Sequence, residues 1–115
     1  MAYDINLQDR VCQVLKNKNI AFQEKKMMGG LCFMIQEKMC VGIIKENLMI
    51  RVHPETQNEL LLKEGCRMMD FTKRPMKGFL YVEPIAIDMD EDLEYWINQA
   101  LEYNPTAKKS KKKTS

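Results

Sequence analysis

The sequence lacks the residue spacings on which most reactive centres are built. It has one histidine and four cysteines, and no two cysteines form a Cys-x-x-Cys pair. Zinc sites usually take two ligands from one tight turn, so the common zinc motifs are excluded. His53 stands directly before Pro54, with no nucleophile motif beside it, which is typical of a surface or helix-capping histidine. We therefore expect no metal, no cofactor and no catalytic residue, and hence no enzyme.

Long apolar runs and an export signal are absent as well. No stretch approaches the ~20 apolar residues of a membrane-spanning helix, and residues 1–4 show neither the basic nor the apolar part of a signal peptide. The sequence thus predicts a cytoplasmic protein without membrane contact. Its cysteines are expected to be small buried hydrophobic side chains, although Cys32 and Cys40 could meet in a hairpin as a redox pair.

Positive charge is scarce outside the C-terminal end. The net charge is +2, but residues 108–113 alone hold five lysines and no acid. Residues 1–107 therefore carry −3, from 13 basic and 16 acidic side chains. This mildly acidic body argues against a basic nucleic-acid face spread over the whole domain. Residues 83–102 hold seven acids and no base, and the spacing Asp88-Met89-Asp90 lacks the glycine of a calcium loop, so a solvated helix start is the better interpretation.

The order of apolar and turn residues predicts three helices and five strands. Apolar residues at helical spacing indicate a first helix over residues 6–17, capped by Asn6, and a third that is capped by Asp88 or Asp90 and stopped by Pro105. A second helix should start at Pro54, use Leu60, Leu61 and Leu62 as apolar contacts and stop at Gly65. Extended patterns separated by short polar or glycine turns predict strands at residues 22–27, 31–35, 39–44, 48–52 and 78–82.

This order predicts a single α+β domain over residues 1–105. Three short reversals in a row indicate an antiparallel meander, and the simplest architecture is a two-layer sandwich of about five strands with the helices on one face, in the order α-β-β-β-β-α-β-α. The other face of the sheet should be polar, covered by a partner, or closed by dimerisation. Residues 106–115 are expected to form a disordered lysine-rich tail.

The charged segment 63–77 admits two interpretations. It contains Lys63, Arg67, Lys73, Arg74 and Lys77 against two acids, and residues 66–77 are expected to have no regular structure. It could be a docking patch for an acidic partner or a phosphate backbone. Alternatively, Arg74 or Lys77 could pair with Asp70 or Glu83 within the same fold.

Several separated strings resemble the N-terminal domain family of the TfoX (Sxy) proteins, over about residues 3–103. They are Lys25-Lys26-Met27 with Gly29-Gly30-Leu31 and Phe33-Met34, then Leu48-Met49-Ile50-Arg51-Val52 with Pro54, and finally Tyr81-Val82 with the Trp96 helix. The most specific string is Met69-Asp70-Phe71-Thr72 with Arg74-Pro75-Met76-Lys77-Gly78. Met28, His53 and Lys73 depart from the residues common in the family.

The resemblance implies a two-layer sandwich similar to secretion-chaperone folds, and a link to transcriptional control. Full-length TfoX proteins promote natural competence together with the cyclic-AMP receptor protein, and they carry a second, helical C-terminal domain. This sequence ends before such a domain, so a standalone N-terminal domain is expected. The family offers no established catalytic residues to carry over.

The leading hypothesis is a non-enzymatic regulatory module that binds a protein partner, with a transcription regulator as one candidate. The proposed contact residues are Arg67, Asp70, Phe71, Arg74, Pro75, Met76 and Lys77, together with the open sheet face, which could also form a homodimer. The alternative is a nucleic-acid-binding accessory protein that uses segment 63–77 and the tail lysines Lys108, Lys109, Lys111, Lys112 and Lys113. The tail could equally be a solubilising end.

Overall fold

The computed structural model describes residues 3–27, 30–68 and 78–106. In chain order the elements are α1 (Ile5–Asn17), β1 (Gln23–Met27), β2 (Gly30–Ile35), β3 (Lys38–Ile44), β4 (Asn47–Arg51), α2 (Pro54–Leu61), β5 (Cys66–Met68), β6 (Phe79–Val82), the 3-10 turn η1 (Pro84–Ala86), α3 (Asp90–Tyr103) and the 3-10 turn η2 (Asn104–Thr106). The predicted α+β class is confirmed.

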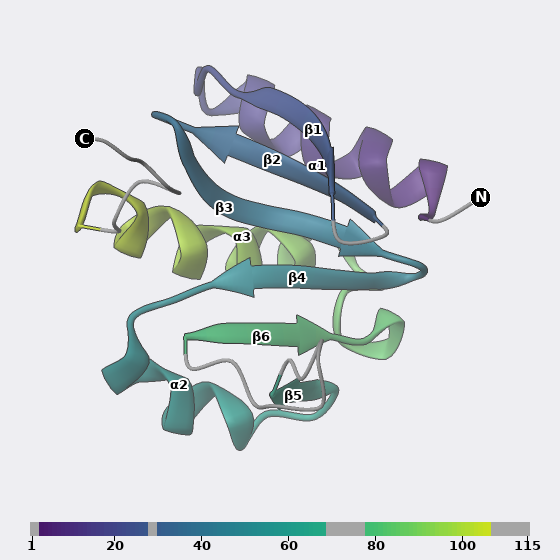
Figure 1. The fold of residues 1–115 in the computed structure, drawn as a ribbon. Helices are drawn as coiled ribbons and strands as arrows, with labels where there is room; N and C mark the ends of the chain where they lie inside the picture. The colour runs from purple at the N-terminus through teal and green to yellow at the C-terminus, as the bar shows by residue number, and fades with distance from the viewer. Residues whose placement is uncertain (1–2, 28–29, 69–77, 107–115) are drawn as a thin grey trace.

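The strands form one antiparallel sheet of six, in the order β1-β2-β3-β4-β6-β5 (Figure 1). The first four strands make the predicted meander, and β6 then pairs with β4. The sixth strand is β5, which lies within a segment that we expected to be irregular. It pairs with β6 through Cys66 opposite Val82 and Met68 opposite Leu80. Three residues are too few to show an alternating pattern, so only the pairing with β6 reveals this strand.

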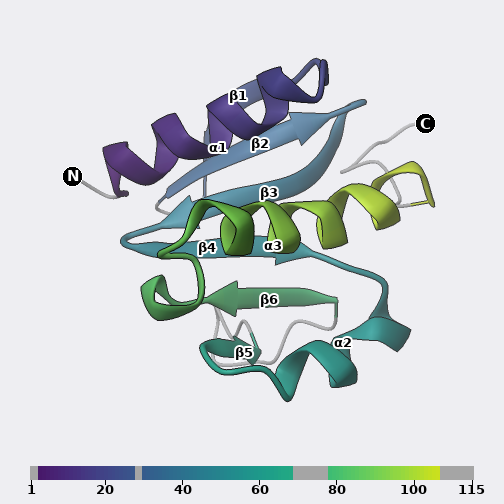
Figure 2. The ribbon, with the colours of Figure 1, turned by 180° about the vertical axis from the view of Figure 1, so that it is seen from behind.

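Helices α1 and α3 lie side by side on one face of the sheet, and α2 lies beyond its β6–β5 end (Figures 1 and 2). The main core fills the space between the two layers. Strand β4 shows the alternation that builds it, since Leu48 and Ile50 point into this core while Met49 points to the other face. The largest side chains buried below 2% exposure on the helix side are Phe33, Leu15, Ile43, Leu48, Ile50, Leu80, Leu93 and Ile97.

The helix starts differ from the prediction in which residue caps them. Asp4, not Asn6, caps α1, because its Oδ1 accepts from the backbone N–H of Asn6 at 2.9 Å and of Leu7 at 3.3 Å. Met89 precedes α3 and gives no side-chain cap, so neither predicted aspartate has that role. Both segments offer polar residues two positions apart, and sequence alone cannot rank them. Three acids do occupy the first turn of α3, as expected.

Helix α2 is shorter than predicted. It starts at Pro54 as expected, with His53 as its cap, but it ends at Leu61 and not at Gly65. Leu60 is buried, whereas Leu62 is 88% exposed and contributes nothing to the core. Consecutive residues on a helix differ by about 100° in direction, so three successive leucines cannot all face one core. Gly65 has a φ of +84°, which suits glycine, and marks the turn into β5.

Candidate functional site

Only the start of the predicted docking segment falls within the described residues. Arg67 lies on the edge strand β5, while Asp70, Phe71, Arg74, Pro75, Met76 and Lys77 lie outside the described residues, as do the tail lysines from Lys108 to Lys113. Arg67 Nε donates to Glu83 Oε2 at 2.7 Å. Its guanidinium also lies over the ring of Tyr81, 5.1 Å from the centroid.

The ion pair of Arg67 involves an acid that the sequence offered to other bases. Glu83 pairs with Arg67 in the described part of the chain, whereas its expected partners Arg74 and Lys77 lie outside the described residues. Both side chains are close to half exposed, at 47% and 40%. Exposed pairs of this kind contribute about 0–1 kcal/mol, so Arg67 could exchange Glu83 for an acid of another protein at little cost.

The sheet face away from α1 and α3 has an apolar centre. Its centre is a second cluster of buried side chains, with Ile44, Phe79 and Tyr81 packed against it: Cys32, Met34, Met39 and Met49. The four members are 1–9% exposed, so the centre of this face is not polar, although Arg51 and Arg67 lie over Phe79 and Tyr81. Ile44, Phe79 and Tyr81 are partly exposed, so they and not the methionines are the apolar contacts that this cluster can offer.

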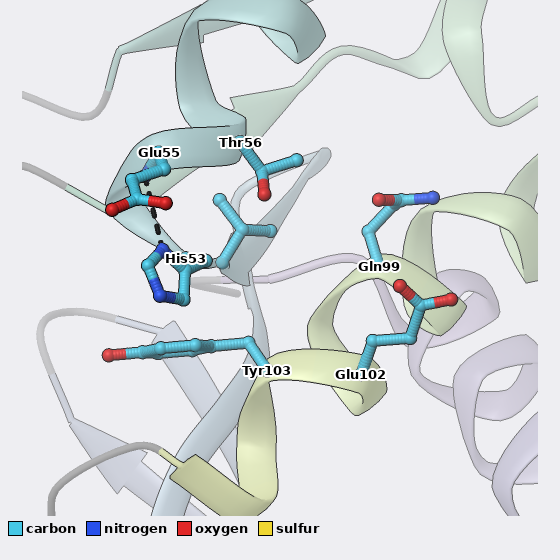
Figure 3. A pocket seen from close by; sticks show the side chains of 7 residues that line it. His53, Glu55, Thr56, Gln99, Glu102 and Tyr103 are labelled. Carbon is cyan, nitrogen blue, oxygen red and sulfur yellow. Dashed lines mark hydrogen bonds between the residues drawn. The ribbon is translucent and has the colours of Figure 1, made fainter.

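His53 lies at a pocket of about 360 Å³ between the start of α2 and the end of α3 (Figure 3). Its Nδ1 accepts from the backbone N–H of Glu55 at 3.2 Å, and its ring meets Tyr103 edge to face at 5.5 Å between centroids. Gln99 and Glu102 lie on the opposite wall and do not converge on the imidazole (Figure 3). The histidine is exposed and caps a helix, as the sequence predicts.

The four cysteines are thiols in protonated form. Burial raises the pKa of Cys32 and Cys66 to about 11 and that of Cys40 to about 12. For Cys12, burial together with a hydrogen bond to Glu24 raises the pKa to about 11. Protonated thiols are poor nucleophiles and poor metal ligands. All four are free, and Cys32 and Cys40 belong to different clusters, so the redox pair that the sequence left open is not formed.

Sequence patterns did not predict a buried lysine, Lys38, that forms hydrogen bonds with the backbone at the C-terminal end of α3. Lys38 is 9% exposed, and its Nζ donates to the backbone oxygens of Asn104 and Pro105, each at 3.0 Å. Asn104 Nδ2 donates in turn to the backbone oxygen of Ile35 at 3.3 Å. We expected Lys38 in the turn, but Gln36 and Glu37 make that turn with positive φ values of 55° and 66°. A lysine beside a hairpin carries no sequence signal for such a contact.

Within residues 3–27, 30–68 and 78–106, no group of three or more His, Cys, Asp or Glu side chains is placed to hold a metal ion. Over the same ranges, no helix has the length and apolar character required to cross a membrane.

Comparison with known proteins gives one match. Residues 19–103 match the family described as the TfoX N-terminal domain. A search of the curated proteins and a search of the solved structures each found no match. The matched range holds the whole sheet, α2 and α3, and leaves out α1. Because this range is well over half of the sequence, the chain belongs to the TfoX N-terminal domain family.

Proposed function

We propose that this chain is a non-enzymatic regulatory module that acts in the cytoplasm by binding a protein partner. The supporting observation is that the histidine, a buried lysine and the cysteines have structural roles. His53 caps α2, Lys38 fastens the end of α3, and burial keeps the cysteines protonated. Lys38 and the cysteines are not available as acids, bases or nucleophiles in these roles, and no nucleophile motif accompanies His53. A function at the surface follows.

The proposed contact surface is segment 67–77 with the adjoining aromatic side chains of β6. Arg67 sits at the sheet edge, and its guanidinium covers Tyr81, so positive charge and apolar area are combined at one place. The further bases of the segment, Arg74 and Lys77, add charge of the same sign. Such a surface suits an acidic patch on another protein, where complementary charge favours fast and specific association.

A transcription regulator is the class of partner that we propose for this surface. The support is the family itself, because the resemblance to TfoX proteins implies a link to transcriptional control. A module of this kind would act on gene expression through the regulator that it binds, without contacting DNA itself.

The test is the double substitution Arg74→Ala/Lys77→Ala. Tagged wild-type and variant chains are used to capture proteins from a lysate of the source cells, and each captured protein is quantified by mass spectrometry. We expect the specific partner to be captured several-fold less well, since two favourable charge contacts are lost. The matched control is Lys25→Ala/Lys26→Ala on β1, which removes the same charge from exposed positions elsewhere. A large fall in the thermal midpoint with unchanged capture of the partner would show that Arg74 and Lys77 stabilise the fold and do not bind the partner.

A further inference from the structure

The pocket beside His53 is lined by polar groups that the fold does not use. It holds about 360 Å³ between the start of α2 and the end of α3, and the buried side chain of Val52 contributes to its lining. Its other lining residues are drawn in Figure 3: His53, Glu55, Thr56, Gln99, Glu102 and Tyr103. In the described part of the chain, four of these side chains form no hydrogen bond or ion pair: Glu55, Thr56, Gln99 and Glu102.

The lining of the pocket is negatively charged. Glu55 and Glu102 lie on opposite walls (Figure 3), and among the described residues no lysine or arginine lines the pocket. His53 adds no positive charge while it caps α2, because an Nδ1 that accepts the backbone N–H of Glu55 carries no proton. The charge of the two carboxylates is therefore not balanced within the pocket itself.

Two bases lie just outside the pocket, and both have contacts of their own. The guanidinium of Arg51 lies over the rings of Phe79 and Tyr103, at 5.4 and 5.8 Å from their centroids. Lys38 Nζ donates to the backbone oxygens that follow α3, at residues 104 and 105. Neither base is among the residues that line the pocket.

Glu102 stands where its own helix disfavours a carboxylate. It lies in the last turn of α3, and that turn holds no basic side chain. The C-terminal end of a helix carries roughly half an elementary negative charge, so it repels an acid and attracts a cation. A residue that conflicts with its local structure without a compensating contact is typical of a functional site. The conflict at Glu102 indicates a ligand that brings the missing positive charge.

We propose that this pocket binds the guanidinium group of an arginine side chain from a partner protein. A guanidinium is planar and has five N–H donors, so it can donate to Glu102 and Gln99 on one wall while it stacks on the ring of Tyr103. The ammonium group of a lysine is compact and lacks this planar face. Glu55 on the opposite wall adds to the attraction for the cation.

The exposed rim of the pocket indicates a ligand that is part of a larger molecule. His53, Glu55 and Glu102 are exposed, and 360 Å³ is near the lower end of the range for pockets that enclose a small molecule. A side chain carried by a protein needs no such enclosure, because contacts around the rim hold it in place. The two carboxylates disfavour nucleic acid and anionic lipid, since both present phosphate. This inference goes beyond the proposed function, because it names a second contact site that does not include Arg67.

The experiment titrates the ¹⁵N-labelled full chain with Nα-acetyl-L-arginine amide and follows the backbone amide chemical shifts. We expect saturable shifts at residues 53–56 and 99–103, with a dissociation constant of about 1 mM or weaker, because one side chain makes few contacts. Nα-acetyl-L-citrulline amide has nearly the same shape without the charge, and it should bind about fivefold more weakly or worse. The proposal is overturned if the two compounds bind equally, or if no saturable shift occurs at these residues.

Glu102→Gln tests the carboxylate that carries the argument. This variant keeps the size of the side chain and removes its charge, so it should weaken binding of the arginine compound by about fivefold or more. The matched control is Glu91→Gln, which removes the same charge from an exposed position in the first turn of the same helix and should leave binding unchanged. Equal affinity of Glu102→Gln and wild type would contradict the proposal.

The thermal midpoint of Glu102→Gln gives an independent check. Because the end of α3 repels the carboxylate, the midpoint should stay unchanged or rise by up to about 5 °C. A clear fall would show that Glu102 stabilises the fold, and it would remove the reason for expecting a cation in the pocket.

Free L-arginine tests whether the ligand is a metabolite. Its α-carboxylate is repelled by the acidic lining, so it should bind no more tightly than the blocked compound. Binding that is about tenfold tighter would identify the free amino acid as the ligand and overturn the assignment to a protein side chain. The titrations contain no partner protein, so their outcome is independent of the capture experiment with Arg74→Ala/Lys77→Ala.

Discussion

The two faces of the sheet both have apolar centres, yet these are built from different side chains. On the helix side, Phe33 and its neighbours are branched or aromatic, and they pack against the regular stripes of α1 and α3. On the other side, three of the four buried members are methionines. Branched and aromatic side chains have few rotamers and specify one packing arrangement, whereas methionine adapts to an irregular space. The comparison predicts that substitutions on the helix side lower the free energy of unfolding more than substitutions on the methionine side do.

The largest effect is expected for Phe33→Ala on the helix side. Phe33 is fully buried and its ring lies 5.6 Å from that of Phe22. Loss of the ring and the cavity left behind should lower the free energy of unfolding by about 3–5 kcal/mol, measured by urea denaturation. Met34→Leu, at the next position and on the other face, should cost less than about 1.5 kcal/mol. Equal losses would contradict the comparison.

Gly42→Ala tests how far the methionine side can adapt. A Cβ at Gly42 would lie 2.8 Å from Met49 Cε and also 2.8 Å from the backbone oxygen of Leu31. The methionine can move away, but the backbone oxygen cannot without shifting β2. We expect a loss of about 1–3 kcal/mol of unfolding free energy. If Met49→Ala in the same chain restored full stability, the methionine and not the strand would be the obstacle.

Alkaline pH should lower the free energy of unfolding, because Cys40 in the main core loses its proton. Burial raises the pKa of this thiol from 9.0 to about 12. Because the folded state holds the proton more tightly than the unfolded state does, the stabilisation is complete below pH 9 and is lost as pH rises toward 12. Cys40 is expected to account for about 1 kcal/mol of the loss at pH 10, seen in urea denaturation at a series of pH values. Cys40→Ala should make this slope smaller without abolishing it, because the pKa values of the other three thiols are raised as well, and an unchanged slope would contradict the prediction.

The smallest effect is expected at the junction between β4 and α2. His53→Ala removes the side chain that accepts from the N–H of Glu55, and should cost about 1 kcal/mol. His53→Asn supplies another capping acceptor and should restore most of the loss. Thermal denaturation of the three chains checks this order. If the asparagine variant is as unstable as the alanine variant, the contact with Tyr103 and not the cap is what matters.

The elements that were predicted correctly have a hydrophobic pattern that repeats regularly along the sequence. The stripe of Leu93, Trp96 and Ile97 and the alternation in β4 each repeat over several residues, so the hydrophobic pattern alone determines them. Strand β5 could not be predicted, because three residues show no period and its partner lies in another segment. Leu62 was assigned to the core because local pattern does not say where the helix ends.

The candidate site was harder to predict than the fold. Charge pointed to segment 63–77, of which the structure describes residues 63–68. The ion pair between Arg67 and Glu83 joins β5 to the residue after β6 and depends on the register of the two strands, which the sequence does not state.

The contact between Lys38 and the end of α3 couples two parts of the protein that are far apart in the sequence. Lys38 Nζ donates to the backbone oxygens of Asn104 and Pro105, so the β2–β3 hairpin and the C-terminal end of α3 hold each other in position. A substitution that removes this ammonium group therefore releases both elements, although it changes one residue of one strand.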